Sequence, residues 1–259
     1  MAHLRLRGEP LRGPSGLPIP IDAVLFDKDG TLSHSEPMLL RLSRLRLEHC
    51  LSLSHGGAEL RDLLVRAYGL DRDGVHPGGI TAVGARDHNL IATATALAQV
   101  GHSWPDGFAI AEEAFETAER LLAADPETPT PQPLPGTVAM LNRLSGAGLI
   151  CAVISNDHRH GIQQFLATHA LAHHFTGLWS AEHHPRKPAP AAVQGLCDQL
   201  GVAPGRCALI GDAASDLRMA TAAGVPIALG YRAGWRRPPQ LDPGSLGLEH
   251  WDELDARPG

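Results

Sequence analysis

Short apolar runs that end abruptly in polar residues or glycine recur along this chain, and each predicts a buried strand followed by a loop. The four runs cover residues 21–26, 149–154, 207–210 and 225–229. Helix-like spacing of apolar residues accompanies the later runs, over residues 137–144, 159–170, 190–200 and 215–223. Strands that alternate with helices predict a parallel sheet, and such sheets bind ligands beyond the carboxyl ends of their strands.

The pattern changes between residues 34 and 130, where strand-like runs give way to helix-like spacing. The helical segments cover residues 38–53, 58–68, 87–100 and 107–124. Five prolines between residues 126 and 135 then predict an extended, semi-rigid connector. We therefore expect an α/β fold. A Rossmann-like core would comprise residues 1–33 and 131–259, and an inserted all-helical cap domain residues 34–130, with hinges near 33–36 and 129–135.

Length and composition are typical of a soluble globular enzyme with a sizeable core: 259 residues, of which 43% are hydrophobic and 19% charged. The net charge of −6 argues against nucleic acid as a partner. No run approaches the roughly 20 apolar residues that a membrane span needs. Four cysteines without C-x-x-C spacing indicate a reducing compartment, so we expect a cytoplasmic protein, monomeric or homodimeric.

Lysine is rare in this chain, which has two lysines against twenty arginines. Lys28 stands between Asp27 and Asp29, and Lys187 lies in the sequence Arg-Lys-Pro-Ala-Pro. An ammonium group reaches one oxygen as a compact point charge, which the planar guanidinium of arginine does not. An isolated pair of acids after a strand is equally consistent with a turn or a helix cap, so the interpretation depends on the wider context.

Four motifs supply that context. They are Asp27-Lys28-Asp29-Gly30-Thr31-Leu32 after the first apolar run, Ser155 after the second, Lys187-Pro188 in a loop, and Gly211-Asp212-Ala213-Ala214-Ser215-Asp216 after the third. In order and context they resemble the four motifs of the haloacid dehalogenase superfamily. The resemblance extends from about residue 20 to 235, and the helical block falls where that family places its cap. It is strongest to the phosphoglycolate-phosphatase-like members.

The resemblance implies covalent chemistry for the two acids after the first run. Asp27 would be the nucleophile that attacks phosphorus and forms an aspartyl-phosphate. Asp29 would protonate the leaving oxygen and then activate water, a role that contributes roughly 10²–10⁴-fold to the rate. Among true dehalogenases this second acid is absent, because a halide leaves without a proton.

The other motif residues would bind the phosphoryl group. Lys187 would neutralise its charge and Ser155 would donate a hydrogen bond to one of its oxygens. Asn156 and Gly30 would add further donors. Taken alone, Ser155 is also consistent with an ordinary residue at a strand end.

The resemblance also implies a magnesium site. Asp212 and an oxygen of Asp27 would bind Mg²⁺, together with the backbone carbonyl of Asp29, while Asp216 would support the water shell of the ion. Taken alone, Asp212 and Asp216 are consistent with a helix cap and a first-turn acid.

In the helical block, Arg44 and Arg86 are candidates for binding the leaving group of the substrate, together with Asp87 and His88. A solvated helix face is the alternative for the arginines Arg41, Arg44, Arg46 and Arg61. Lys28 occupies a position where the family often has an apolar residue, so we expect it to pair with a nearby carboxylate or face the cap, without a catalytic role. The fifteen histidines show no convincing zinc spacing, and we expect them at the surface or in loops.

These observations predict a Mg²⁺-dependent phosphatase that hydrolyses a small phosphorylated metabolite through an aspartyl-phosphate. A phosphomutase, which replaces water with a sugar hydroxyl, is one alternative. A non-catalytic phosphate-binding or scaffold protein is the other.

Overall fold

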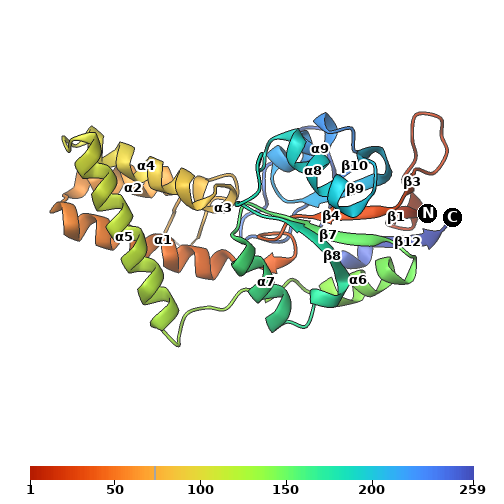
Figure 1. Cartoon of the computed structure of the whole chain (residues 1–259), viewed down its shortest axis with the longest axis horizontal. Helices are drawn as coiled ribbons and strands as arrows, with labels where there is room; N and C mark the ends of the chain where they lie inside the picture. Colours follow the sequence, from red (N-terminus) through yellow and green to blue (C-terminus); the bar gives the residue numbers. More distant parts are fainter. Residues whose placement is uncertain (73) are drawn as a thin grey trace. The chain divides into compact units, whose positions relative to one another are not determined.

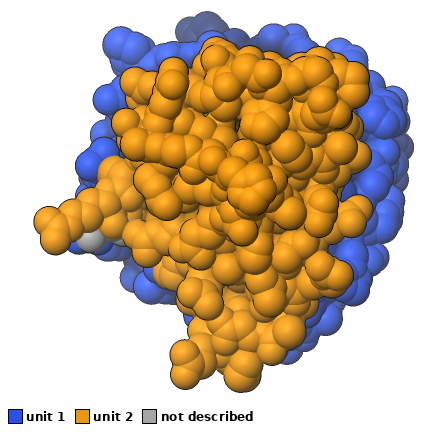
Figure 2. Space-filling view, turned by 90° about the vertical axis from the view of Figure 1, so that its left-hand side faces the viewer, with its two compact units in different colours: residues 1–34, 132–259 blue, residues 35–131 orange. Residues whose placement is uncertain are grey.

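The computed structural model describes residues 1–72 and 74–259. The chain divides into two compact units, one formed by residues 1–34 and 132–259 and the other by residues 35–131, which Figure 2 shows in different colours. Each boundary lies one residue beyond the position expected from the sequence. We call the first the core unit and the second the helical unit.

The core unit is built on a six-stranded sheet in the order β11-β10-β9-β4-β7-β8, and every neighbouring pair of strands is parallel (Figure 1). The strands are β4 (Ala23–Phe26), β7 (Ile150–Ile154), β8 (Phe175–Trp179), β9 (Cys207–Gly211), β10 (Ile227–Tyr231) and β11 (Leu246–Leu248). The predicted α/β, Rossmann-like architecture is confirmed. Strands β8 and β11 were not expected, because a glycine interrupts the apolar residues of each.

Helices cover both faces of this sheet (Figure 1). They are α6 (Thr137–Gly146), α7 (Arg159–Thr168), α8 (Pro190–Leu200) and α9 (Ala214–Ala222). Successive residues of the fully buried strand β4 enter opposite layers, because side chains alternate along a strand. Val24 and Phe26 join the apolar cluster that contains α6 and α7, whereas Ala23 and Leu25 join the cluster that contains α8 and α9.

The two ends of the chain form a second, smaller sheet. Strand β1 (Ala2–Leu6) pairs antiparallel with β12 (Leu254–Pro258), β2 (Glu9–Pro10) and β3 (Pro20–Ile21). The predicted strand 21–26 is therefore wrong in its first two residues: Ile21 belongs to the small sheet, and β4 begins at Ala23. Between them Asp22 forms a two-point ion pair with Arg206, with both nitrogen–oxygen distances 2.9 Å. This pair lowers the pKa of Asp22.

The helical unit contains α1 (Glu36–Ser54), α2 (Ala58–Tyr68), α3 (Ile80–Val83), α4 (Arg86–Gln99) and α5 (Trp104–Ala124). Its own apolar cluster is centred on α1, α2, α4 and α5, with Phe115 fully buried. Among the described residues, no helix is both long and apolar enough to cross a membrane.

The chain passes between the units twice. The proline-rich connector ends in β6 (Gln132–Pro133), which pairs antiparallel with β5 (Ser33–His34) in the core unit. Three short 3₁₀ helices complete the described structure, at Ala172–His174, Pro204–Arg206 and Trp251–Glu253.

Trp251 lies in the 3₁₀ helix that leads into β12 of the small sheet, packs against two strands of the large sheet and is only 1% exposed. Its ring stacks on Tyr231 at 4.4 Å between centroids and meets Phe26 edge-on at 6.0 Å.

We expect Trp251→Ala to lower the free energy of unfolding by about 3–5 kcal/mol, because it leaves a cavity that the surrounding strands cannot close. Chemical denaturation measures this. The control is Trp104→Ala, at a half-exposed ring. A loss below about 1 kcal/mol in Trp251→Ala would contradict this role.

Candidate active site

Three neighbouring strands end at the same edge of the large sheet, and a predicted site residue follows each of them. Asp27 follows β4, Ser155 follows β7 and Asp212 follows β9. Strands β4 and β9 run parallel with Phe26 beside Ile210, and the backbone N–H of Asp27 donates to the carbonyl of Ile210 at 2.9 Å. Parallel pairing therefore brings together side chains that are far apart in the sequence.

A cluster of three buried carboxylates lies at this edge. Asp27, Asp212 and Asp216 each present an oxygen within 4.8 Å of the other two, and the three residues are 8%, 2% and 2% exposed. Burial raises the pKa of Asp27, an effect that the charge of Lys187 opposes. Burial, together with the charges of Asp27 and Asp216, raises the pKa of Asp212 well above its usual value. The cluster therefore favours a cation.

Lys187 supplies one positive charge to this cluster. Its Nζ lies 2.8 Å from Asp27 Oδ1 and 2.8 Å from Asp216 Oδ1, and it donates to the carbonyl of Ile154 at 3.3 Å. Burial alone would lower the pKa of Lys187, but the charges of Asp216 and Asp27 outweigh it, so the pKa rises. Lys187 thus stays charged and links the loop after β4 to the helix after β9.

Two residues that sequence reasoning did not select orient Asp212. Thr31 Oγ1 donates to Asp212 Oδ1 at 3.0 Å, and Trp235 Nε1 donates to Asp212 Oδ2 at 2.6 Å. Trp235 is 6% exposed and lies four residues after β10 ends. The sequence signal for a site residue was that Trp235 follows a strand at the carboxyl edge of the sheet. Nothing in the local sequence indicates that the loop after this strand folds back toward Asp212.

Gly30 is required where this loop folds back. Its φ of +75° is unfavourable for other residues, and a Cβ there would lie 2.0 Å from Trp235 Nε1 and 2.8 Å from Asp212 Oδ2. A Cβ on Gly234 would in turn lie 1.7 Å from the carbonyl oxygen of Gly30. The two glycines allow the backbones of the two loops to pack directly against each other.

The remaining motif residues lie beside this cluster. Ser155 is 3% exposed and its Oγ accepts a hydrogen bond from the backbone N–H of Asp157 at 3.1 Å. Asn156 follows it and is half-buried. Asp29 pairs with Lys28 at 2.5 Å, and Lys28 also lies 3.1 Å from Asp157 Oδ2. Lys28 thus pairs with nearby carboxylates, which confirms one of the two expectations stated for it.

The residues present fit a magnesium ion. Asp27, Asp212 and Asp216 offer hard carboxylate oxygens, and the hydrogen bonds from Thr31 and Trp235 fix the orientation of one of them, as outer partners of metal ligands do. The three buried carboxylates of this cluster contact one lysine, Lys187, and the negative charge that remains is one that a divalent cation would balance. Among the described residues this is also the one acidic or histidine-containing group arranged to hold a metal.

The candidate substrate-binding arginines belong to the helical unit. Arg44 is exposed, and its Nη2 donates to the carbonyl of Arg72 at 2.9 Å. Arg86 Nε lies 2.7 Å from Glu119 Oε1, and its guanidinium lies over the ring of Phe115. Each is therefore engaged within its own unit.

Two surface expectations are wrong. Arg46 is 7% exposed rather than part of a solvated helix face, because it lies over the Phe115 ring at 4.0 Å and pairs with Glu119 at 3.1 Å. His174 is also buried, with its Nδ1 3.4 Å from Ser145 Oγ.

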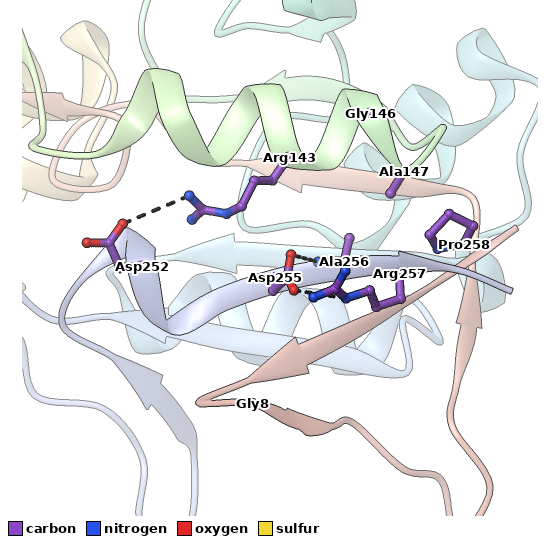
Figure 3. A pocket seen from close by; sticks show the side chains of 9 residues that line it. All are labelled: Gly8, Arg143, Gly146, Ala147, Asp252, Asp255, Ala256, Arg257 and Pro258. Carbon is purple, nitrogen blue, oxygen red and sulfur yellow. Dashed lines mark hydrogen bonds and ion pairs between the residues drawn. The ribbon is translucent and has the colours of Figure 1, made fainter.

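An open cavity of about 660 Å³ lies elsewhere in the core unit, beside α6 and β12, and contains none of the predicted site residues (Figure 3). Arg143 of α6 lines this cavity and donates to the carbonyls of Trp251 at 2.7 Å and Leu254 at 3.1 Å. Arg257 lies 3.3 Å from Asp255. Both arginines are thus used within the fold, and we assign this cavity no function.

Comparison with known proteins shows the family to which the chain belongs. The family model of haloacid dehalogenase-like hydrolases matches residues 21–224, and the chain belongs to this family. The predicted superfamily and the predicted hydrolase class are confirmed.

Individual relatives are more distant. The chain is 28% identical over 239 residues to phosphoglycolate phosphatase of Rhodospirillum rubrum, covering 87% of this chain and 86% of the relative. It is 26% identical over 215 residues to phosphoglycolate phosphatase of Neisseria meningitidis, covering 82% of each. A solved structure described as a predicted phosphoglycolate phosphatase from Haemophilus somnus superposes with a TM-score of 0.65 at 22% identity, covering 89% of this chain and 95% of that one. At that identity the structural likeness shows the fold alone.

Replacement of Asp212 tests the metal site without any assay of activity. Magnesium at about 100 times its Kd stabilises a single-site protein by about 2.7 kcal/mol, seen as a rise in Tm. We expect Asp212→Asn to lose most of this magnesium-dependent rise, because it removes one buried anionic ligand. The matched control is Asp198→Asn, at an exposed position of α8, which should keep the full rise. An undiminished rise in Asp212→Asn would contradict the assignment.

Proposed function

We propose that this protein is a Mg²⁺-dependent phosphatase that hydrolyses a small phosphorylated metabolite through an aspartyl-phosphate at Asp27. The observation that carries the proposal is the buried contact of 2.8 Å between Lys187 Nζ and Asp27 Oδ1 inside the carboxylate cluster. A nucleophile with an ammonium group and two further acids around it suits phosphoryl transfer, in which charge must be balanced on both the attacking and the transferred group.

The reaction follows from the roles of the side chains. The Asp27 carboxylate attacks phosphorus, the bond from phosphorus to the leaving oxygen breaks, and the carboxyl group of Asp29 donates its proton to that oxygen. Asp29 then accepts a proton from water, and the resulting hydroxide attacks the aspartyl-phosphate. Inorganic phosphate leaves and the carboxylate of Asp27 is restored.

The phosphoryl group is held by residues that do not react. Lys187 offsets its negative charge beside Asp27, and Ser155, whose Oγ accepts from Asp157, keeps its own hydrogen to donate to a phosphoryl oxygen. Asp27, Asp212 and the backbone carbonyl of Asp29 would hold magnesium, with Asp216 beside them, and the ion would supply further charge neutralisation. Asn156 and Gly30 are proposed as additional donors.

Phosphoglycolate is the first substrate to test, because the similar proteins from R. rubrum and N. meningitidis are named phosphoglycolate phosphatase.

We propose that the helical unit acts as the cap that closes over the substrate and excludes water. Arg44 is the better candidate for contact with the leaving group, since it is exposed, whereas Arg86 is paired with Glu119.

The four reduced, buried cysteines support the proposed cytoplasmic location.

We expect Asp27→Asn to lower phosphate release by at least about a thousandfold, because an amide is not a competent nucleophile. Release from p-nitrophenyl phosphate in saturating Mg²⁺ measures this, with Asp198→Asn as the control that keeps wild-type activity. Wild-type turnover by Asp27→Asn would refute the nucleophile.

Removal of metal and analysis of products separate the alternatives. A phosphatase should release free phosphate from phosphoglycolate or sugar phosphates, and EDTA should abolish that release until Mg²⁺ is restored. A phosphomutase would instead return an isomeric sugar phosphate. A scaffold would release nothing from a broad panel of phosphoesters under either condition.

A further inference from the structure

Lys28 is a buried cation held between two carboxylates that come from different loops. Its Nζ lies 2.5 Å from Asp29 Oδ1 in the loop after β4 and 3.1 Å from Asp157 Oδ2 in the loop after β7. The residue is 3% exposed, and its ammonium lies 5.7 Å from the centre of the Phe165 ring on α7. Burial of an ammonium group is costly unless it is paired, so these contacts hold the side chain in one place.

The second carboxylate is itself fixed. Asp157 Oδ1 accepts from the backbone N–H of His158 at 2.7 Å, while its backbone N–H donates to Ser155 Oγ at 3.1 Å. Its carbonyl accepts from the N–H of Ala181 at 2.9 Å. Three hydrogen bonds thus hold Asp157, which serves as an anchor, and Lys28 connects this anchor to Asp29.

We propose that Lys28 is a positioning residue for the acid–base reaction of Asp29. This inference rests on the proposed phosphatase function. A contact of 2.5 Å to one oxygen of a carboxylate restricts the directions open to its other oxygen, and general acid catalysis depends on that direction.

The contacts of Lys28 favour this role over direct binding of substrate. Its ammonium is buried against Asp29 and Asp157, whereas Lys187 is the lysine that contacts the nucleophile Asp27. Lys28 therefore acts through Asp29. The competing explanation is a purely structural role in balancing charge between the two loops, which would alter all reactions of the enzyme alike.

Leaving groups that differ in their need for a proton distinguish the two explanations. The p-nitrophenolate ion leaves without protonation, whereas an alkoxide must receive the proton of Asp29. We expect Lys28→Met to lower kcat/KM for an alkyl phosphate such as glycerol phosphate by about 100-fold. For p-nitrophenyl phosphate we expect a fall of less than about threefold, because kcat/KM reports steps up to departure of the leaving group.

A second readout follows the other half of the reaction. When Asp29 is poorly placed to activate water, the aspartyl-phosphate should accumulate. Lys28→Met should then show a pre-steady-state burst of p-nitrophenolate.

Asp157→Asn provides a second variant that keeps the lysine, in case Lys28→Met does not fold. It weakens the anchor, so we expect the same selective loss toward the alkyl phosphate, by about tenfold. Asp29→Asn gives the reference pattern for loss of the acid itself. The magnesium-dependent rise in Tm should be retained in both Lys28→Met and Asp157→Asn, which shows that the carboxylate cluster is intact.

Equal losses toward both substrates, or no loss toward either, would overturn the role of Lys28. Absence of phosphate release by the wild-type protein from either substrate would instead refute the proposed function, and the role of Lys28 with it. Failure of the role of Lys28 would thus be seen in the variants, whereas failure of the proposed function would be seen in the wild-type protein.

Discussion

Mutual repulsion among buried carboxylates is the constraint around which the core unit is arranged. Asp27, Asp212 and Asp216 are all at most 8% exposed and lie within reach of one another, which is unfavourable for anions in a low-dielectric environment. The 2.8 Å contacts from Lys187 to Asp27 and Asp216 relieve part of this repulsion. A protein that needed only stability would bury apolar residues here, so the cluster supports the proposal that this edge of the sheet binds a cation and a phosphoryl group.

The fold places these charges through strand order and loop packing. Strand β4 lies at the centre of the sheet with β9 and β7 on either side, so the residues after the three strands emerge at one edge. Gly30 and Gly234 then allow the loop after β10 to reach Asp212 with the indole of Trp235. On the other side, Lys28 ties the loop after β4 to the loop after β7. The cluster is thus fixed from several directions by residues that do not react.

The sequence was most informative where a single local signal was strong. The helix 190–200 was predicted with its observed bounds, because a proline opens it and a glycine follows it. The acids of the site could be proposed because Asp27 and Asp212 each follow an apolar run and because four ordered motifs together resemble those of one family. Trp235 and Thr31 could not be proposed in this way, because their importance lies in hydrogen bonds to Asp212. Trp235 is 23 residues away from Asp212 in the sequence, and Thr31 is 181 residues away. The pairing of the chain ends and the division of residues 21–26 between two sheets also depend on long-range partners. Arg46 was misjudged for the same reason, because its partners Phe115 and Glu119 lie on another helix.

The covalent intermediate on Asp27 is the most direct measure of the proposed chemistry. The wild-type protein would be mixed with phosphoglycolate or p-nitrophenyl phosphate and Mg²⁺, quenched in acid within milliseconds, digested and mapped by mass spectrometry. We predict a phosphoryl group on the peptide that contains Asp27, formed only when Mg²⁺ is present and lost as phosphate is released. Phosphate release with no phosphorylated peptide at any quench time, or a phosphoryl group on a different residue, would contradict the account.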